Sequence, residues 1–210
     1  MPYDDNFQVK KQRPEDIYRD VRNYYKNDTL LKYANSKNLM RIQEKITKRV
    51  IDILNFKNSQ KLILDAGCGP GFASFYLQQH GFRLVSLDLI NEFLKVYDMS
   101  GLNPINGDMC NCSFRPNSFD GIVSISALQW IYQDFDKEKT NKIMIGLVKS
   151  FYSMLKEHGK IVIQFYPKNS EVMKKVGTYF IDNASFEGGY IIDNLKSPKK
   201  RKIYLKLKKF

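Results

Sequence analysis

The sequence predicts an α/β fold in which a mostly parallel sheet is covered by helices on both faces. Short apolar segments alternate with helical patterns along most of the chain, an order that is typical of βαβ units. Several of these segments, such as Leu62–Leu64, are continuously apolar, as expected of strands that are buried on both faces. A Gly-rich turn follows Leu62–Leu64 and leads into a helical pattern, which is typical of a ligand-binding β-turn-α unit.

The N-terminal part of the chain is predicted to be helical. Residues 1–15 are polar and expected to be irregular, and the Tyr-rich segment from Asp16 to Asp28 has a weak helical pattern. From about Ser36 to Leu54, apolar residues recur near a 3.6-residue period, which predicts an amphipathic helix. We expect one domain over residues 1–210, with a helical N-terminal segment over 1–55 and an α/β core over 56–210.

The elements of the core follow from the remaining patterns. Strands are expected at 62–64, 84–87, 104–106, 119–125 and 161–165, and helices at 72–79, 92–98, 139–156 and 171–183. Pro104 favours a sheet edge because it lacks an N–H group. His158-Gly159 is expected to end the helix over 139–156. Residues 190–193 and 202–208 should pair as a closing hairpin, with Tyr204, Lys206 and Lys208 on a solvated face.

Charge and composition limit the function classes. Hydrophobic residues make up 43% of the chain, which excludes global disorder, and no apolar run reaches the length of a membrane-spanning helix. The net charge is +12, and eight of the 34 Lys and Arg residues lie between Lys196 and Phe210, where no acid occurs. This basic edge suits a polyanion, although a solvated hairpin explains it equally well. The run Lys199–Lys202 suits either nuclear import or contact with RNA phosphates.

Three cysteines and a charged N-terminus indicate an intracellular protein. The odd count of Cys68, Cys110 and Cys112 does not resemble a disulfide framework. Cys110 and Cys112 lack a second pair of ligands and a nearby His, so we expect no metal site there. The first residues carry charge where a signal peptide needs an apolar stretch.

The strongest local motif is the sequence from Leu64 to Gly71, in which Asp65 precedes a Gly-x-Gly-x-Gly turn. Glycines allow a tight turn and a close approach of the backbone to a ligand. Asp88 ends the next predicted strand, seventeen residues after Gly71. A carboxylate at that place can accept hydrogen bonds from both hydroxyls of a ribose.

Two ligands fit this motif. A dinucleotide usually requires Gly-x-Gly-x-x-Gly, which seats its pyrophosphate. Here the third Gly comes one residue earlier, and an acid precedes the first Gly. This arrangement favours S-adenosylmethionine, which has a cationic amino-acid end and no phosphate. Asp108-Met109 follows the predicted strand over 104–106, where the acid can accept the adenine amino group and the Met can pack on the ring.

Further segments give the chain a more specific resemblance. They are Tyr33, Ile42-Gln43, Ile63 to Gly69, Asp108-Met109, Phe114 to Gly121, Ser124 to Trp130, Gln164 to Asn169, and Phe186 to Tyr190. On these residues the chain resembles the eukaryotic 18S ribosomal RNA (guanine-N7) methyltransferase family over about residues 13 to 208. The resemblance implies a class I methyltransferase fold, Rossmann-like, with a mostly parallel seven-stranded sheet and a C-terminal antiparallel hairpin.

The resemblance also implies an activity and partners. The activity is transfer of a methyl group from S-adenosylmethionine to N7 of a guanine in small-subunit rRNA, with a role in small-subunit maturation. The product of the donor is S-adenosylhomocysteine. The implied partners are the pre-small subunit and a small zinc-binding activator protein, which would pair with the edge strand at Pro104–Asn106. The implied location is nuclear or nucleolar and cytoplasmic.

The expected site has a donor side and an acceptor side. The donor-binding candidates are Tyr33, Asp65, Gly67, Cys68, Gly69, Asp88, Leu89, Asp108, Met109, Ser124 and Ser126. The acceptor-wall candidates are Gln129, Trp130, Phe165, Tyr166 and Asn169. Tyr24 and Tyr25 could join Tyr33 in a lid over the donor or dock the entry helix. Guanine N7 has no proton to lose, so no general base is expected, and His80 and His158 are assigned structural roles at helix ends.

Two alternative functions stay open at this point. One is methyl transfer to another acceptor, such as tRNA or a small molecule. The other is a ribosome-assembly factor whose catalysis is dispensable.

Overall fold

The computed structural model describes residues 11–58, 60–132, 137–198 and 200–210. The described chain forms a seven-stranded sheet in the order β3-β2-β1-β4-β5-β7-β6. Strands β1 (Leu62–Ala66), β2 (Arg83–Asp88), β3 (Pro104–Asn106), β4 (Phe119–Ile125) and β5 (Leu155–Phe165) are parallel. Strands β6 (Phe186–Asp193) and β7 (Lys202–Lys209) form the antiparallel hairpin that completes the sheet. The predicted fold class is therefore confirmed, and β3 lies at an edge of the sheet as expected.

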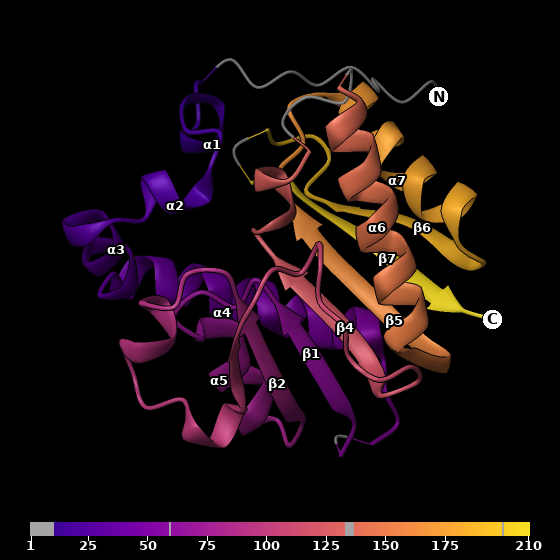
Figure 1. The fold of residues 1–210 in the computed structure, drawn as a ribbon, viewed down its shortest axis with the longest axis horizontal. Helices are drawn as coiled ribbons and strands as arrows, with labels where there is room; N and C mark the ends of the chain where they lie inside the picture. The colour runs from indigo at the N-terminus through magenta and orange to yellow at the C-terminus, as the bar shows by residue number, and fades with distance from the viewer. Residues whose placement is uncertain (1–10, 59, 133–136, 199) are drawn as a thin grey trace.

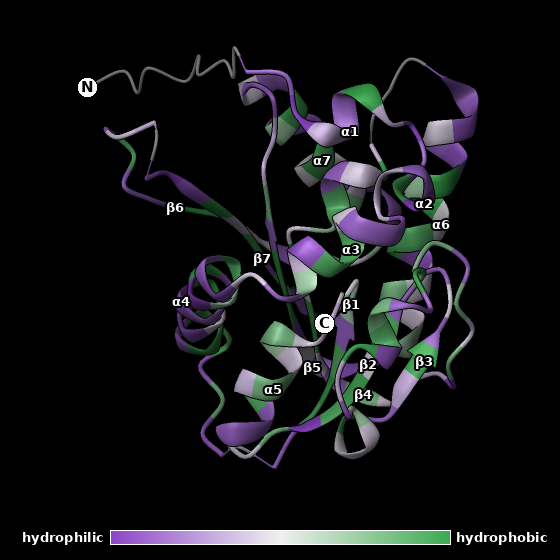
Figure 2. Ribbon diagram, turned by 90° about the vertical axis from the view of Figure 1, so that its left-hand side faces the viewer, coloured by the Kyte–Doolittle hydropathy of each residue, from purple (hydrophilic) through white to green (hydrophobic). Residues whose placement is uncertain are grey.

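Helices cover both faces of this sheet. Helices α4 (Lys37–Leu54) and α5 (Phe72–Gln79) lie on one face, and α6 (Glu138–Met154) and α7 (Ser170–Asn183) lie on the other (Figures 1 and 2). The short helices α1 (Pro14–Ile17), α2 (Val21–Tyr24) and α3 (Asn27–Ala34) gather beyond the carboxyl ends of the parallel strands (Figure 1). Parallel α/β sheets bind their ligands at this end. Within the described ranges, every helix is too short or too polar to span a bilayer.

Each face of the sheet has its own hydrophobic core. Ile122 of β4 packs with Phe151 and Leu147 of α6, whereas the next residue, Val123, packs with Val50 of α4 on the opposite face. All five side chains are at most 1% exposed. The central strands can therefore carry consecutive apolar residues, because successive side chains enter two different cores.

Several helix boundaries agree with the sequence patterns. Ser36 caps α4, and its hydroxyl accepts a hydrogen bond from the Leu39 amide (3.3 Å). Asn169 caps α7 in the same way through Val172 (2.8 Å). Serine and asparagine are preferred at this position because their side-chain oxygen accepts from a free N–H group of the first turn.

The entry segment and the residues after β2 differ from the predictions. The segment from Asp16 to Asp28 is not one helix, because the backbone is extended at Asp20 and Lys26. It contains the end of α1, all of α2 and the start of α3. The helix expected at 92–98 is only a 3₁₀ turn over Phe93–Lys95, followed by a second turn over Ser100–Leu102. Residues 1–15 were expected to be irregular. The first ten lie outside the described residues, and Pro14 and Glu15 are helical, because they begin α1.

The boundary between α6 and β5 was also predicted wrongly. Helix α6 ends at Met154, and β5 begins at the next residue, Leu155, which pairs with Phe119 of β4. Pairing resumes between Lys160 and Gly121, so residues 156–159 form an excursion within the strand. His158 has a φ of +61° there and does not lie at a helix end. His158-Gly159 does form a turn, as predicted, but the turn lies in the irregular part of β5 and not at the end of a helix.

The solvated face predicted for β7 is incomplete. Tyr204 is only 2% exposed and packs with the α4 side of the core, because α4 covers this part of the sheet. Lys206 and Lys208 are half-buried. The division of the chain into segments 1–55 and 56–210 stays a prediction.

Candidate active site

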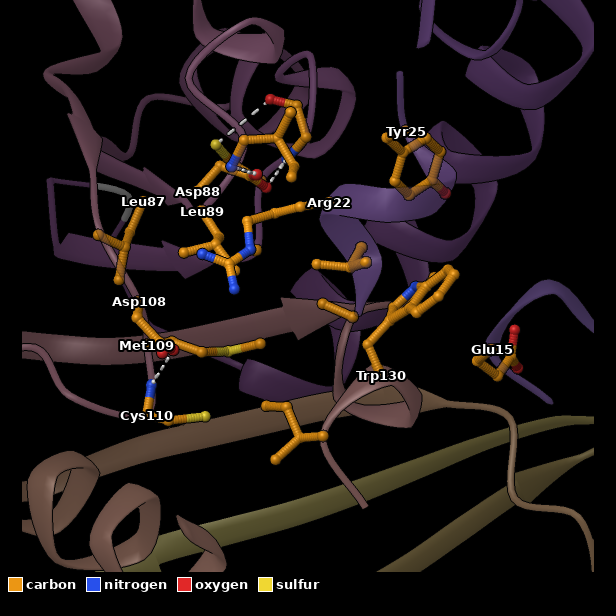
Figure 3. Close-up of a pocket in the computed structure, with 18 of the residues that line it drawn as sticks. Glu15, Arg22, Tyr25, Leu87, Asp88, Leu89, Asp108, Met109, Cys110 and Trp130 are labelled. Atoms are coloured by element: carbon orange, nitrogen blue, oxygen red, sulfur yellow. Dashed lines mark hydrogen bonds between the residues drawn. The ribbon is translucent and has the colours of Figure 1, made fainter. Parts of the chain in front are cut away.

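A pocket of about 860 Å³ opens at the carboxyl ends of β1, β2 and β4. The loops after these strands form its floor, and residues of α1, α2 and α3 form its roof (Figure 3). The topology explains this arrangement, since parallel strands bring the residues that follow them to one edge of the sheet. The predicted donor motifs and the N-terminal segment therefore meet in one cavity.

The glycine-rich loop between β1 and α5 folds back against β2. The amides of Gly67 and Cys68 both donate to the carbonyl oxygen of Leu87, at 2.8 and 3.0 Å. Gly67 has a φ of +85°, and a Cβ atom there would lie 2.4 Å from Cβ of Ala127. Glycine is thus required at position 67 by its backbone angle and by the packing of the next loop.

Gly69 differs from Gly67 in its surroundings. It also has a positive φ, +56°, but a Cβ atom there would meet no protein atom within 4 Å. Because Gly69 lines the pocket, this space is open to a ligand. The loop fits a group that approaches the backbone closely, as the spacing predicts.

Asp65 at the end of β1 is the most buried acid of the site, at 1% exposed. Its Oδ2 accepts a hydrogen bond from Ser74 (2.6 Å), and Ser74 accepts one from Ser86 (2.8 Å). Its Oδ1 is buried and has no hydrogen-bond partner. Burial raises the pKa of Asp65 to about 7. A carboxyl with one unpartnered oxygen in a pocket wall fits a cationic amino group of a ligand.

Asp88 at the end of β2 is held by the backbone of two loops. Its Oδ2 accepts from the Gly69 amide (2.7 Å), and its Oδ1 accepts from the Ile90 amide (2.8 Å). Burial raises its pKa to about 6, against the lowering effect of these amides. Each carboxylate oxygen keeps a second lone pair, so the ribose role expected for Asp88 fits this geometry.

Asp108 and Met109 lie beside Leu89 on the same side of the pocket (Figure 3). Asp108 Oδ1 accepts from the Cys110 amide (2.8 Å), which fixes the turn after β3. Met109 approaches Gly67, since its Cε lies 3.6 Å from the Cβ position of that residue. The structure thus brings the predicted adenine side into contact with the predicted loop.

The two serines predicted for the donor site have different positions. Ser126 lines the pocket with a φ of +58°. Its hydroxyl donates to Gln164 Oε1 (2.9 Å) and accepts from Gln43 of α4 (3.4 Å), a network that holds the loop after β4. Ser124 is 1% exposed in the middle of the sheet and does not line the pocket.

An aromatic cluster closes the pocket from the N-terminal side. The ring of Tyr25 lies 5.2 Å from Tyr33, 4.9 Å from Phe93 and 5.9 Å from Trp130, measured between ring centroids. Tyr24 also contacts Trp130, at 5.6 Å. Burial raises the pKa of Tyr33 to about 12. The cluster fits either of the two roles considered for these tyrosines, a lid over the donor or a contact that docks the entry segment, and the choice between them stays a prediction.

Of the five acceptor-wall candidates, Trp130 lines the pocket. Phe165 is completely buried in the hydrophobic core, so the prediction that it faces the acceptor was wrong. Asn169 caps α7, and Gln129 is turned toward the Ser126 carbonyl (2.8 Å). The Tyr166 ring lies under Arg13 and Lys202. These four residues do not line the pocket.

Several lining residues escaped the sequence analysis. Glu15 and Arg22 reach the pocket from the short N-terminal helices, and Gln43, quoted above only for the resemblance, reaches it from α4. Ser74 of α5 does not line the pocket but donates a hydrogen bond to Asp65. The Arg22 side chain extends between Asp88 and Asp108 (Figure 3) and is bound to Asp20 (2.7 Å). Polar residues in short helices carry no periodic signal, so only the path of the chain in space reveals them.

The described residues contain no group of three His, Cys, Asp or Glu side chains arranged to hold a metal ion. Burial raises the pKa of Cys110 and of Cys112. His80 follows the last residue of α5, with its Nδ1 2.8 Å from the Tyr76 carbonyl oxygen. His80 and His158 do not line the pocket.

Comparison with known proteins identifies relatives of this site. A family model described as a methyltransferase domain matches residues 64–163. Among curated proteins, the mouse 18S rRNA (guanine-N(7))-methyltransferase is 33% identical over 87% of this chain, and a Schizosaccharomyces pombe relative with the same activity in its name is 29% identical over 92%. The chain spans 66% of the mouse protein's length and 71% of the S. pombe protein's.

Solved structures share the fold at low sequence identity. A magnesium protoporphyrin IX methyltransferase from Synechocystis, solved with S-adenosylmethionine, has a TM-score of 0.63 at 15% identity, covering 97% of this chain and all of its own. An S-adenosylmethionine-dependent methyltransferase from Listeria monocytogenes has a TM-score of 0.59 at 15% identity, covering 81% of this chain and 99% of its own. With the fold, the glycine loop and the relatives together, the chain has the fold of class I methyltransferases and is similar along most of its length to 18S rRNA (guanine-N7)-methyltransferases.

Proposed function

We propose that the chain transfers a methyl group from S-adenosylmethionine to N7 of a guanine in small-subunit rRNA and thereby takes part in small-subunit maturation. The observation that carries this proposal is the similarity along 87% of the chain to proteins named for that activity. The pocket supports it, because the donor motifs predicted from the sequence line one cavity beside an aromatic cluster.

Different residues of the chain would bind different parts of the donor. Asp65 would pair with the ammonium group through its unpartnered Oδ1, and the open space beside Gly69 would take the methionine moiety. Asp88 would accept from the ribose hydroxyls, while Asp108 and Met109 would hold the adenine, with Leu89 and Cys68 lining the same wall. When bound, the donor supplies a methyl group on a positively charged sulfur.

On the acceptor side, the chain has to position the base and exclude water. The N7 lone pair lies in the plane of the ring, so the attack needs alignment and no removal of a proton. Tyr25 and Trp130 offer aromatic faces for a splayed base, and such stacking contributes about 1–3 kcal/mol per base. The pocket rim also carries Arg19, Lys137 and Lys139, which suit the phosphates of an RNA strand.

A small zinc-binding activator is the proposed partner at β3. This strand is three residues long, exposed on every residue, and at the edge of the sheet. Ile105 is 38% exposed there. A strand added to this edge would pair with free main-chain groups and cover the Ile side chain. Nucleolar and cytoplasmic location is proposed on the basis of the rRNA substrate.

The test is a methyl-transfer assay on small-subunit precursors with labelled donor, using the protein purified with its activator. We expect label at a single guanine of the small-subunit rRNA, mapped by N7-specific cleavage. Label on tRNA and none on the small-subunit rRNA would show that tRNA is the acceptor, and the proposed rRNA acceptor would be wrong. If cells require the protein but tolerate Asp65→Ala, its essential role is assembly and not catalysis.

A further inference from the structure

Glu15 is a pocket residue with no role in the donor site described above. It lies in α1, a four-residue helix that is anchored on both sides of it. The Arg13 guanidinium donates to the Tyr166 carbonyl oxygen, and Lys168 forms an ion pair with Asp16 (2.5 Å). Asp16 also accepts from the Arg13 amide (2.9 Å). These contacts fix the backbone that carries Glu15.

The Glu15 side chain forms part of the wall of the pocket. Only 10% of its side-chain surface is exposed. Its ion pair with Arg13 is long, 3.8 Å, and is weaker than the short pair that Lys168 makes with Asp16. Burial raises the pKa of Glu15. The charges of Arg13 and Lys168 counter this rise, and a carboxylate whose ion pair is 3.8 Å long keeps much of its capacity to accept hydrogen bonds.

Its position relative to the donor side is informative. Glu15 lies across the pocket from Asp88 and Asp108, and Trp130 lies between the two sides (Figure 3). A purine that presents N7 to the donor presents its N1 and N2 edge in the opposite direction. In guanine this edge carries an N1–H group and an amino group, which are hydrogen-bond donors in a row. Adenine has an acceptor at N1.

We infer that Glu15 recognises the acceptor base, accepting hydrogen bonds from N1–H and the 2-amino group of guanine while the base stacks near Trp130. This inference rests on the proposed function and assigns the specificity of the same site. Extruded bases are commonly read by hydrogen bonds to this edge together with aromatic stacking. An acid discriminates against adenine because the two acceptors would face one another without a proton between them.

Trp130 provides the reporter for a binding test, because it is the single Trp of the chain. The full chain, saturated with S-adenosylhomocysteine, is titrated with GMP, IMP or AMP up to millimolar concentrations while Trp130 fluorescence is followed. IMP lacks the 2-amino group and should bind about tenfold more weakly than GMP, the cost of one hydrogen bond to a charged group. AMP should bind more weakly still.

The variant Glu15→Gln should lose this preference, so that GMP and IMP bind alike, while its affinity for S-adenosylhomocysteine stays that of the wild type. Glu187→Gln is the matched control, since Glu187 is exposed on the edge strand β6. Weaker binding of S-adenosylhomocysteine by Glu15→Gln would assign Glu15 to the donor and overturn the inference. Equal loss of GMP and IMP binding with a lowered melting temperature would leave Glu15 a structural residue and also overturn it.

The wild-type protein decides the matter even if Glu15→Gln does not fold. Equal responses to GMP and IMP, including no response to either, would contradict guanine recognition by Glu15. The proposed function fails separately, when the wild type transfers no methyl group to small-subunit rRNA. Transfer to rRNA with an unchanged KM and kcat in Glu15→Gln would retain the function and reject the inference.

Discussion

Asp65 and Asp88 are neighbouring acids that the fold uses in different ways. Both are buried, but Asp88 has two backbone amides on its oxygens and Asp65 has one serine hydroxyl. Desolvation therefore acts on Asp65 with less compensation, and its pKa rises to about 7, against about 6 for Asp88. The ligand itself has to complete the hydrogen bonding of Asp65.

This difference predicts a pH dependence of donor binding. Below pH about 7 the free chain holds Asp65 protonated, and a neutral carboxyl cannot pair with an ammonium group. The affinity for S-adenosylmethionine should fall as the pH is lowered from 8 to 6, with Asp88 adding to the loss below about 6. Calorimetric titration at several pH values measures it. Affinity that is constant over this range would contradict a pairing role for Asp65.

Asp65 also makes the stability of the free chain depend on pH, but in the direction opposite to its effect on donor affinity. The pKa of Asp65 is higher in the folded chain than its ordinary value of 3.8, so the folded state binds more protons between these values. The stability that this group contributes is present at low pH and is lost as the pH rises through about 7.

Asp65→Asn separates these effects. The amide keeps the shape of the side chain and cannot ionise, so donor affinity should fall about 10- to 100-fold at pH 8, the loss of a charge-assisted hydrogen bond. Its affinity should also lose most of its pH dependence near 7. The matched control is Asp98→Asn, an exposed acid outside the pocket, which should bind the donor as the wild type does.

Two glycines of one loop predict opposite phenotypes. Gly67→Ala should destabilise the fold by more than about 1 kcal/mol, because alanine is strained at positive φ and its Cβ would clash with Ala127 at 2.4 Å. Gly69→Ala carries backbone strain but no clash, so its larger effect should be on donor affinity. Thermal unfolding and donor titration of both variants test this. Equal losses of stability in the two variants would contradict the prediction that only Gly67 is required by packing.

At the scale of elements, Lys209 explains how a helix can end where a strand begins. Its ammonium group donates to the carbonyl oxygens of Tyr152 (3.0 Å) and Leu155 (2.8 Å) at the end of α6, and to Asn117 (3.1 Å). The last carbonyl groups of a helix need such donors when no loop follows. The residue is 5% exposed although its strand neighbours Lys206 and Lys208 are not buried.

We expect Lys209→Met to reduce the free energy of unfolding by about 1–3 kcal/mol, because buried acceptors lose their donor. Lys206→Met, on the same strand, is the control and should change stability by less than about 0.5 kcal/mol. Urea denaturation of both variants measures the difference. Equal midpoints would mean that water replaces the ammonium group at the end of α6.

At the scale of the whole molecule, the sheet has two edges of different character. Edge strand β6 has eight residues, and edge strand β3 has three, all exposed. Short edge strands resist self-association, but β3 also presents Ile105 beside the loops of the pocket. A partner at this edge would lie next to Asp108 and Met109, which follow β3 after Gly107.

Co-expression tests this partner surface. The chain expressed alone should be poorly soluble, and co-expression with the zinc-binding activator should raise its soluble yield. Ile105→Asp should abolish this rescue, whereas Ile181→Asp, at an exposed Ile of α7, should not. Equal soluble yields with and without the activator would argue against an obligate complex.

The sequence by itself determined the sheet, the ends of α4, α5 and α7, and the donor motifs. Periodicity, cap residues and the glycine spacing are local signals, and Asp65, Gly67 and Asp88 lie where those signals indicated. The tertiary structure alone decided which residues share the pocket. Phe165 turned into the core, and Glu15 and Ser74 entered the site. Their positions depend on packing between distant segments, for which a single sequence carries no local pattern.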